Sequence, residues 1–385
     1  MISVTDDDRR RALNSDQPLV SVVIPALNAS TYIERTLRSA MRQTYTALEI
    51  IVVNDGSTDD TAKLVEQTAM SDSRINLLST PNRGVAAARN TGIEASSGRF
   101  VAFLDADDLW HPTKIEKQVN ALKRLSSRWV AVYALHYVIN EDDEIIRPGS
   151  SDVARGYIYA RHLNLKYIGN GSALLVRRDV ALKIGGFDSS YAAAGIGGCE
   201  DLDFELKLAA RYFIEVVPER LVGYRKHPGS MSSNHLRMGK SALEVVRRSL
   251  AANPVLPRYV IGSAIDATRK YAFWEFRQAR RAYLSLVTIL PILRSDPQFV
   301  VRLLLEKSLR LMQYLRPASV IAIGEDSLRM NSVKFDDQVV PSFLDCPSET
   351  PRFRRHLVRL AAVDASLNST LAPRVEEIVM RAKVE

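Results

Sequence analysis

Short runs of β-branched and aliphatic residues alternate with amphipathic stretches through residues 19–108, and this alternation constrains the fold more than any other feature of the sequence. Each apolar run has the length of a strand, and each following stretch has apolar residues at helical spacing. Strands that alternate with helices form a mainly parallel sheet covered by helices on both faces. The predicted strands are LVSVVIP, LEIIVV, INLLST and RFVAFL, and the predicted helices are TYIERTLRSAMRQ, DDTAKLVEQTAM, opening near Ser57 or Thr58, and VAAARNTGIEA.

Three of the predicted strands run directly into short polar loops, at 25–28, 54–57 and 105–108. In open α/β sheets, ligands bind beyond the carboxyl ends of the strands, where such loops gather. We therefore expect these three loops to line one crevice.

The rest of the chain extends this sheet and then changes character. Residues 129–140 and the stretch after EDDE predict antiparallel strands, EDLDFELKLAARY predicts a helix, and FIEVVP and LVGYRKH predict two last strands. Beyond them the chain becomes helical and basic, and then loses periodicity. We expect a flexible N-terminus (1–18), an α/β domain (19–235), a basic helical extension (236–316), a linker (317–351) and a C-terminal helix (352–385).

Composition places the chain among soluble globular proteins, because 46% of its 385 residues are hydrophobic and 25% are charged. Its two cysteines, Cys199 and Cys346, are too few for a disulfide framework and form no CxxC pair that would hold zinc. The first residues contain no apolar segment typical of a secretory signal, and the most apolar later stretch, 282–293, is too short to span a bilayer. These features predict a cytoplasmic protein.

Positive charge is concentrated in one part of the chain. Residues 236–316 contain 15 Lys/Arg and 5 Asp/Glu, a net charge of +10, whereas the whole chain carries +8 and the remainder therefore −2. Within this segment, residues 299–316 have leucines at helical spacing between basic residues. Such a helix either lies on an anionic membrane surface or packs its leucines on the domain and leaves a solvated basic face.

The acidic motif FLDADD follows the fourth predicted strand and contains Asp105, Asp107 and Asp108. Strand residues two apart point the same way, so Asp105 and Asp107 can converge where the strand ends. Two close carboxylates repel each other unless a cation or a proton lies between them, and Mg²⁺ or Mn²⁺ with open positions for diphosphate oxygens fits such a pair. The alternative is a solvated acidic turn that caps the next helix.

Two further motifs lie at the same edge of the predicted sheet. In VVNDGSTDD, Asp55 can accept hydrogen bonds from a nucleoside N–H or from ribose hydroxyls, or it can be an Asx-turn residue. In NRGVAAARNTGIEA, Arg83 or Arg89 can hold a base carbonyl or a phosphate, although an ordinary surface charge is the simpler interpretation of Arg83.

Two motifs near the end of the domain supply candidate catalytic groups. GGCEDLDFELKLAAR places Glu200 and Asp201 at a helix N-terminus, where the dipole and free amides lower a carboxyl pKa and leave a general base for an acceptor hydroxyl. A capping role is the alternative for Glu200. In YRKHPGSMSSN, a neutral His227 can bind the same metal and Arg225 can contact the diphosphate, although a lone histidine is more often structural.

These motifs, in this order, resemble those of the family 2 glycosyltransferases, which have the GT-A fold. The resemblance covers about residues 19–234 and rests on VSVVIPALNAS, VNDGSTDDT, NRGVAAARNTGIEASSGRFVAFLDADDLWHPTKIEKQ, CEDLDFELKLAAR and YRKHPGSMS. It implies a Rossmann-like α/β fold with a mixed, mainly parallel sheet flanked by helices, here followed by an α-helical C-terminal extension. Asn54 and Cys199 stand where relatives usually carry an aspartate and an aromatic or charged residue.

The resemblance also implies a role for each motif residue. Asp201 would be the catalytic base, with Glu200 on the acceptor side. Mg²⁺ or Mn²⁺ would be bound by Asp105, Asp107 and His227. The nucleotide-sugar site would be formed by Pro25, Ala26, Asn28, Asp55, Arg89 and Asp105, and the interpretation of YRKHPGSMSSN adds Arg225.

We therefore expect an inverting, metal-dependent hexosyltransferase that moves a sugar from a nucleotide diphosphate, with UDP favoured, to a hydroxyl of a glycan or lipid-linked acceptor in surface polysaccharide or glycoconjugate synthesis. A non-catalytic nucleotide-sugar sensor or scaffold is the main alternative. A nucleic-acid-binding protein is disfavoured because the domain has no recognition motif, and a nucleotidyltransferase would need a Gly-rich basic loop where PALNAS stands. The expected location is cytoplasmic, peripheral on the inner face of the cell membrane.

Overall fold

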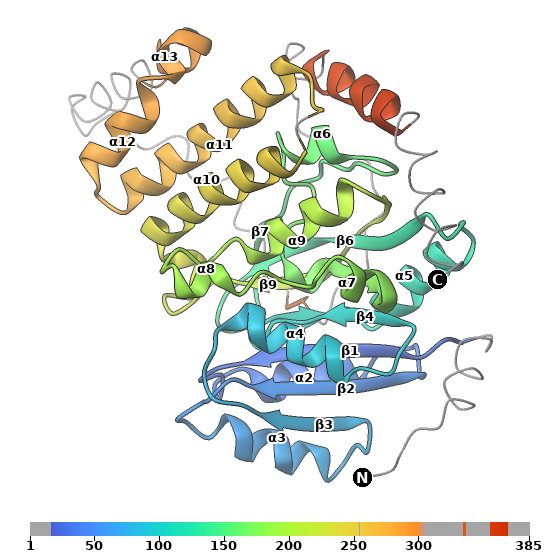
Figure 1. Cartoon of the computed structure of the whole chain (residues 1–385). Coiled ribbons are helices and arrows are strands. Elements are labelled where there is room, and N and C mark those ends of the chain that lie inside the picture. Colours follow the sequence, from blue (N-terminus) through green and yellow to red (C-terminus); the bar gives the residue numbers. More distant parts are fainter. Residues whose placement is uncertain (1–16, 254, 302, 304–333, 336–354, 369–385) are drawn as a thin grey trace, which may run out of the picture.

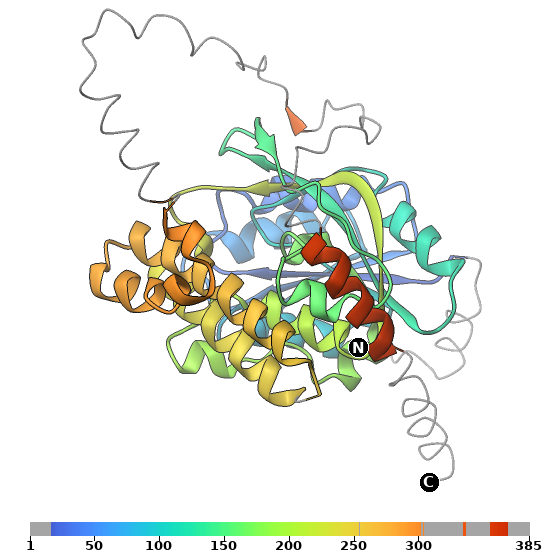
Figure 2. The same ribbon diagram turned by 90° about the horizontal axis from the view of Figure 1, so that it is seen from above.

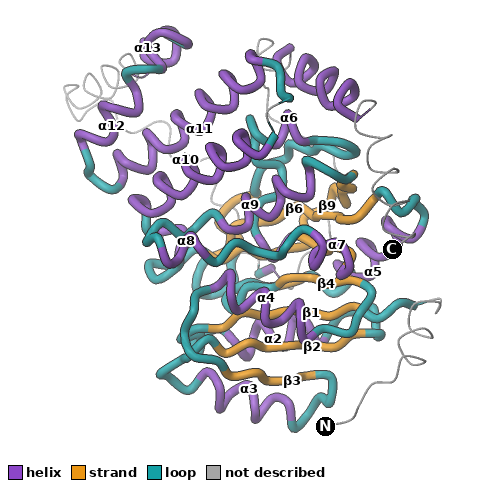
Figure 3. Tube along the Cα trace, viewed as in Figure 1, coloured by secondary structure: helices purple, strands orange, loops and turns teal. Residues whose placement is uncertain are grey.

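The computed structural model of the chain describes residues 17–253, 255–301, 303, 334–335 and 355–368. Its centre is one mixed sheet with the strand order β3-β2-β1-β4-β8-β6-β9-β5, and β7 pairs with β6 (Figure 1, Figure 3). The strands are β1 (Val20–Ala26), β2 (Leu48–Asn54), β3 (Ile75–Ser79), β4 (Phe100–Phe103), β5 (Leu109–Trp110), β6 (Trp129–Ile139), β7 (Ile145–Pro148), β8 (Leu174–Arg177) and β9 (Phe213–Arg225).

The first half of the sheet is parallel, as the alternation of strands and helices predicts. Strand β1 pairs in parallel with both β2 and β4, and β2 pairs in parallel with β3. The chain therefore moves outward from β1 to β3 and then returns to the other side of β1 for β4. Such a reversal is a topological switch point, and the loops that leave β1 and β4 there make room for a ligand.

Three helices connect these strands: α2 (Ile33–Met41), α3 (Thr61–Ala69) and α4 (Val85–Ala95). Right-handed crossovers place α2 and α3 on one face and α4 on the other, because the third connection runs in the opposite direction (Figure 1, Figure 2). Helix α4 packs closely on β1 at Gly92, where an added Cβ would lie 2.3 Å from Val23 Cγ1. The three helices lie within the stretches that the sequence predicts.

The second half of the sheet contains the antiparallel strands that the sequence predicts after residue 129. Strand β8 is antiparallel to β4 and β6, and β6 forms a hairpin with β7. The predicted separate strands FIEVVP and LVGYRKH form one strand, β9, because the long strand β6 pairs with both parts of it. The helices of this half are α5 (Lys114–Lys123), α6 (Tyr159–His162), α7 (Arg178–Lys183), α8 (Ser190–Ala193) and α9 (Glu200–Ala209).

In the described part of the chain, the sheet is followed by the helices α10 (His235–Ala252), α11 (Arg258–Gln278), α12 (Ala282–Ile289) and α13 (Ile292–Ser295). Helix α10 packs on α9, and α11 packs on α10, so the extension lies against the half of the sheet that contains β6 and β9 (Figure 2). None of the helices in the described ranges has the length and hydropathy needed to cross a membrane.

A helix over residues 355–368 returns to the body of the molecule. Its buried Asp364 carboxylate accepts hydrogen bonds from Ala160 N at 2.6 Å and from Arg161 Nε at 2.7 Å, both in α6. Of the predicted helix at 299–316, only the first residues belong to the described part of the chain, and most of the predicted linker at 317–351 lies outside it.

Candidate active site

The loops after β1 and β2 are joined around Asn28, which has a φ of 49°. The Asn28 side-chain oxygen accepts a hydrogen bond from Thr58 N at 2.9 Å, and Asn28 N donates to Ser57 Oγ at 2.9 Å. Ser57 and Thr58 are therefore used in this junction, and α3 begins at Thr61 instead of at the predicted position near Ser57 or Thr58. The loops after β1 and β2 thus meet at one edge of the sheet, and the prediction that they line one crevice with the loop at 105–108 stays a prediction.

Asp55 organises the turn that leads into α4. Its side chain is buried, and its two oxygens accept hydrogen bonds from Arg83 N at 2.9 Å and Gly84 N at 2.8 Å. Each oxygen keeps a second lone pair, so a nucleoside contact for Asp55 stays a prediction. Pro25 and Ala26, which belong to the same predicted site, are buried at the carboxyl end of β1.

Arg89 reaches from α4 to the acidic loop after β4. Its guanidinium Nη2 lies 2.5 Å from Asp105 Oδ1, and its Cζ lies 5.1 Å from the centre of the Phe187 ring. The guanidinium is almost fully buried, whereas 27% of the Asp105 side chain is exposed. Desolvation raises the pKa of the Asp105 carboxyl, and the charge of Arg89 counteracts this effect. Asp105 thus has a guanidinium as its cationic partner.

Asp107 pairs with His227, and both residues are predicted to bind the same metal. Asp107 Oδ2 lies 3.0 Å from His227 Nε2, and the His227 ring packs on Tyr32 with ring centres 5.1 Å apart. The hydrogen bond with Asp107 raises the pKa of His227, although partial burial opposes the change. Both side chains are partly exposed, so a ligand in the crevice can reach them.

This pair fits a divalent metal that is shared with a diphosphate. Carboxylate oxygen and neutral imidazole nitrogen are ligands that Mn²⁺ accepts, and two protein ligands leave positions open for phosphate oxygens. In the described ranges, no three His, Cys, Asp or Glu side chains are grouped closely enough to hold a metal. Asp105, predicted as a third ligand, is bonded to Arg89 through Oδ1, so a metal contact for Asp105 stays a prediction.

Arg225 is a correction to the sequence prediction of a diphosphate contact. Its side chain is fully buried, and its guanidinium donates to Asp107 O at 2.6 Å, to Asn140 O, and to Asp143 Oδ1 at 2.5 Å. These bonds occupy the guanidinium on the protein side of the acidic loop. Arg225 therefore supports the backbone of Asp107 and does not face the crevice.

Asp108, the third acidic residue of the loop, is also structural. It is fully buried, and its two oxygens accept hydrogen bonds from Arg225 N at 2.8 Å and Ser172 Oγ at 2.6 Å. Desolvation and the neighbouring carboxylates raise the pKa of Asp108 well above its usual range. Trp110 is buried in the core, with its Nε1 donating to Ser172 O at 2.9 Å. These contacts hold the loop so that Asp107 alone projects toward His227.

Asp201, the predicted base, lies in the first turn of α9 and pairs with a lysine that the sequence did not single out. Lys166 Nζ lies 2.6 Å from Asp201 Oδ2, and Leu202 N donates to Asp201 Oδ1 at 2.8 Å. Burial opposes ionisation of Asp201, but Lys166 and Arg89 outweigh this effect and lower its pKa. Asp201 is therefore held as a carboxylate. Its neighbour Glu200 accepts a hydrogen bond from Gly198 N at 2.8 Å, as expected of a capping residue.

A second buried pair lies one helical turn beyond Asp201. Glu205 Oε2 lies 3.0 Å from His162 Nε2, and both side chains are almost completely buried. Burial lowers the pKa of His162 to about 3 and raises the pKa of Glu205 well above its usual range. A neutral pair therefore supports the part of α9 that carries Asp201. Neither His162 nor Lys166 lies in a recognisable motif, so sequence reasoning missed both.

Asn170 is another residue that the sequence did not single out. It is 5% exposed, and neither polar atom of its side-chain amide has a hydrogen-bond partner within the described part of the chain. The next residue, Gly171, lies against the ion pair: a Cβ there would lie 2.8 Å from Arg89 Nη2 and 3.7 Å from Asp105 Oδ2. A buried amide without partners costs about 1–3 kcal/mol, so a polar ligand at this place would be stabilised.

Residues 21–185 match the profile of the family described as Glycosyl transferase family 2. This region is a family 2 glycosyltransferase domain. An uncharacterized glycosyltransferase of Rickettsia prowazekii (strain Madrid E) is 35% identical to the chain over 181 residues, which are 46% of this chain and 56% of the relative. The chain thus spans about half the length of the curated relatives it matches.

Solved structures share the fold of this family 2 domain. TarS 1–349 of S. aureus, solved in complex with UDP-GlcNAc, superposes with a TM-score of 0.53 at 18% identity and covers 71% of this chain and 77% of that chain. The mannosyltransferase PcManGT of Pyrobaculum calidifontis, solved with GDP-Man and Mn²⁺, gives a TM-score of 0.52 at 20% identity, over 79% of this chain and 86% of that chain. The predicted GT-A architecture is confirmed.

Proposed function

We propose that this family 2 glycosyltransferase domain transfers a sugar, with inversion, from a nucleotide-diphosphate donor to an acceptor hydroxyl. The observation that carries the proposal is the position of Arg89, which bonds to Asp105 and whose charge also acts on Asp201. Because one guanidinium acts on carboxylates of both the acidic loop and the start of α9, we place the donor and the acceptor in a crevice between these two elements. That crevice lies at the switch point of the sheet, where α/β folds bind ligands.

The nucleoside half of the donor would lie over the joined loops of β1 and β2. Asn28 and Asp55 hold these loops together, and Asp55 has lone pairs left for a base N–H or a ribose hydroxyl. Gly171, the residue after Asn170, lies against the Arg89–Asp105 pair, and we propose that the unpaired Asn170 amide turns toward a hydroxyl of the ribose or of the transferred sugar when the donor binds. The UDP-GlcNAc complex of TarS favours a UDP-sugar, and the GDP-Man complex of PcManGT makes a GDP-sugar the second choice.

The diphosphate would lie between the loop of Asp107 and the segment that carries His227. These two side chains would hold Mg²⁺ or Mn²⁺, which neutralises the charge that develops on the leaving diphosphate and is worth several kcal/mol in such reactions. The buried bonds from Arg225 keep the loop backbone in place during this change. The Mn²⁺ bound by PcManGT supports the metal requirement.

Asp201 would accept the proton of the attacking hydroxyl. The acceptor oxygen forms a bond to the anomeric carbon, the bond from that carbon to the diphosphate oxygen breaks, and the hydroxyl proton moves to an Asp201 oxygen. Lys166 keeps Asp201 ionised before attack and holds its orientation. A general base of this kind contributes about 10²–10⁴ in rate.

Donor binding tests the proposal independently of the acceptor. With Mn²⁺ present, titration calorimetry of the protein with a panel of UDP- and GDP-sugars should give heat of binding with one of them, and that donor should raise the Tm. Asp55→Asn should weaken this binding, whereas Asp179→Asn, on the distant helix α7, should leave it unchanged. Absence of binding to every nucleotide sugar would contradict the proposal. Binding without turnover in the presence of a complete acceptor panel would favour the non-catalytic sensor.

A membrane surface is a second candidate partner, favoured by the outer face of α12 and α13. Tyr283, Leu286, Val287, Leu290 and Leu293 are between 43% and 74% exposed, and basic residues flank them at 280–281 and 294. Both helices lie at the end of the molecule away from β3 (Figure 1). An amphipathic basic surface of this kind binds anionic lipid.

Sedimentation with vesicles tests this surface. The protein should sediment with phosphatidylglycerol vesicles and stay in the supernatant with phosphatidylcholine vesicles. Leu286→Glu combined with Leu290→Glu should abolish binding, whereas Met70→Glu, at an 86% exposed position after α3, should not. Equal sedimentation of both variants would rule out a role for α12.

A further inference from the structure

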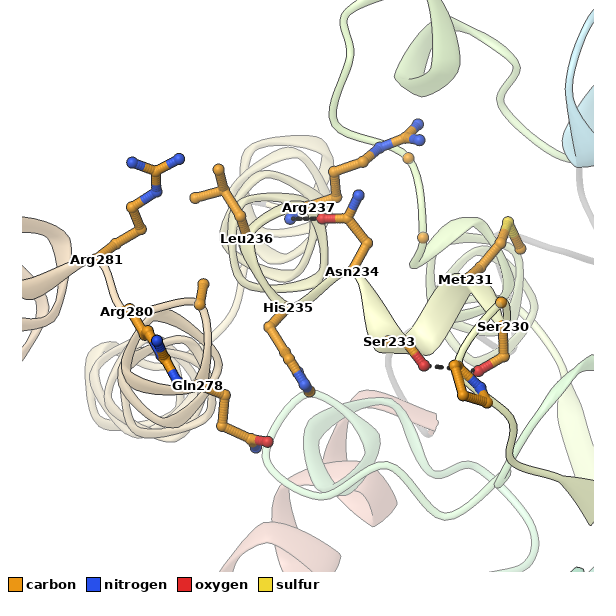
Figure 4. Close-up of a pocket in the computed structure, with 15 residues that line it drawn as sticks. Ser230, Met231, Ser233, Asn234, His235, Leu236, Arg237, Gln278, Arg280 and Arg281 are labelled. Carbon is orange, nitrogen blue, oxygen red and sulfur yellow. Dashed lines mark hydrogen bonds between the residues drawn. The ribbon is translucent and has the colours of Figure 1, made fainter. Parts of the chain in front are cut away.

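A cavity of about 750 Å³ lies beside the proposed catalytic groups and contains none of them. It is lined by three segments, within residues 197–198, 228–237 and 278–281 (Figure 4). The first segment leads directly into Glu200 and Asp201, and the second begins directly after His227. The cavity therefore borders the crevice on the side of the proposed base, and its volume is typical of a ligand site.

The charge of this cavity is strongly one-sided. Three arginines line it: Arg237 in the first turn of α10, and Arg280 and Arg281 after α11. None of the lining residues is acidic, although the Glu200 carboxylate lies at the same turn as the Arg237 guanidinium. No ion pair joins the three guanidiniums to a residue of the described ranges. The one lining histidine, His235, is paired with Glu275, at 2.9 Å between Nδ1 and Oε2.

The backbone at Arg280 is left-handed, so an arginine at this position lowers the stability of the fold relative to glycine. Helix α11 ends with a hydrogen bond from Arg281 N to Phe276 O at 2.9 Å, and Arg280 has a φ of 55°. This closure of a helix favours glycine at the left-handed position, because a side chain there is strained. An arginine at this position is explained if its guanidinium has a function in the cavity.

Arg237 connects the cavity to the catalytic segment. Its Nη2 lies 3.2 Å from the place where a Cβ of Gly197 would be, and Glu200 Oε1 lies 2.5 Å from the same place, so the guanidinium lies close to this turn. Gly198 has a φ of 128° and donates its N–H to Glu200. A ligand held by Arg237 would therefore contact the turn that positions the start of α9.

We propose that this cavity binds an anionic group, a phosphate or a carboxylate, on the acceptor. Guanidiniums form paired hydrogen bonds with both groups, and each of the three arginines that line the cavity offers such a donor from a different side (Figure 4). An acceptor held there would present its hydroxyl toward Asp201, at the end of the Gly197–Gly198 turn. The acceptor role rests on the proposed transferase function, whereas anion binding by the cavity does not.

Calorimetry with small matched probes tests anion binding. Benzyl phosphate and methyl glucuronide represent the two anion classes, and benzyl alcohol and methyl glucoside are their neutral counterparts. At least one anion should bind the wild type ten or more times more tightly than its neutral counterpart, and higher salt should weaken this binding. Saturating UDP should not displace the anion, because the donor site is separate. Whichever anion binds more tightly identifies the acceptor class.

Two variants and one control assign the binding to the cavity. Arg237→Gln/Arg280→Gln/Arg281→Gln should lose at least tenfold in anion affinity. Arg38→Gln/Arg124→Gln/Arg211→Gln, which removes the same charge from exposed positions on other elements, should change it by less than twofold. Arg280→Gly alone should raise the Tm, because it relieves the left-handed position, and yet weaken anion binding severalfold. This last variant separates a binding role from a structural one.

Three results would overturn the inference: no preference for either anion, equal losses in the cavity variant and the control, or displacement of the anion by UDP. Failure of the proposed function is distinguishable, because it would show as absence of nucleotide-sugar binding to the wild type while anion binding to the cavity persists.

Discussion

Lys166 Nζ and Asp201 Oδ2 are 2.6 Å apart, in an ion pair that joins the loop after α6 to the first turn of α9. The pair sets the charge of the proposed base: burial alone would favour the protonated carboxyl, and Lys166 with Arg89 reverses this preference. The lysine is also the residue best placed to align the carboxylate toward the crevice.

Replacement of Lys166 should move the acidic limb of the pH–rate profile. Asp201 has a lowered pKa, so the base is ionised at neutral pH and activity is lost only as the pH falls through that pKa. Lys166→Met removes the main stabilising charge, the pKa of Asp201 rises, and the limb should move to higher pH by about one unit or more.

Lys207→Met is the matched control, because Lys207 pairs with Asp203 on the same helix at 2.7 Å and does not contact Asp201. Its profile should keep the wild-type acidic limb. A Lys166→Met profile that is lower at every pH but unshifted would mean that Lys166 acts only through structure.

Substitution of the Asp107–His227 pair should weaken metal binding. Asp107→Asn and His227→Ala each remove one proposed ligand, so the Mn²⁺ concentration needed for half-maximal binding in the presence of UDP should rise at least about tenfold. Asp142→Asn, in the exposed turn between β6 and β7, should leave this concentration unchanged. Unaltered Mn²⁺ titrations in both site variants would place the metal elsewhere.

Loss of Arg225 should lower the stability of the protein, because Arg225 supports the fold and does not act directly in the reaction. Arg225→Met leaves two backbone carbonyls without their buried donor, and the free energy of unfolding should fall by about 3 kcal/mol. Arg35 bonds to the same Asp143 carboxylate at 2.9 Å, but its side chain is 32% exposed, and Arg35→Met should cost about 1 kcal/mol or less. Urea denaturation measures both values, and equal costs would contradict the structural role assigned to Arg225.

The contact between α4 and β1 should tolerate no added methyl group. Gly92→Ala places a Cβ 2.3 Å from Val23 Cγ1, so the helix must move and stability should fall by about 1–3 kcal/mol. Gly262 is also helical, in α11, and a Cβ there meets nothing within 4 Å. Gly262→Ala should therefore raise stability by about 0.5–1 kcal/mol. Thermal unfolding of both variants decides the comparison, and a stable Gly92→Ala protein would refute the close packing.

Local sequence patterns were sufficient to predict the parallel half of the sheet. Strand length, helical spacing and the polar loops after β1, β2 and β4 are all properties of neighbouring residues. Periodicity after residue 129 also predicted the antiparallel strands, and the resemblance of five ordered motifs added the roles of Asp107, Asp201 and His227. The structure brings two of these candidates, Asp107 and His227, into contact.

Contacts between distant residues could not be predicted in this way. Lys166 lies 35 residues before Asp201 in a stretch without periodicity, and nothing local marks it as a partner. The sequence likewise cannot show that the Arg225 guanidinium is buried against Asn140 and Asp143, because that depends on how β9 pairs with β6. The sequence therefore predicts a ligand contact for Arg225, whereas its guanidinium stabilises the fold.

Release of nucleoside diphosphate tests the central claim most directly. Wild type, Asp107→Ala and Asp201→Asn would be incubated with Mn²⁺ or Mg²⁺, the panel of nucleotide sugars and methyl glucuronide, the anionic probe that carries free hydroxyls, and the release rate followed. The proposed mechanism predicts turnover of one donor by the wild type, and a loss of about 10²-fold or more in Asp201→Asn with donor affinity retained. Turnover by Asp201→Asn at the wild-type rate, or no nucleotide-sugar binding to the wild type, would contradict it.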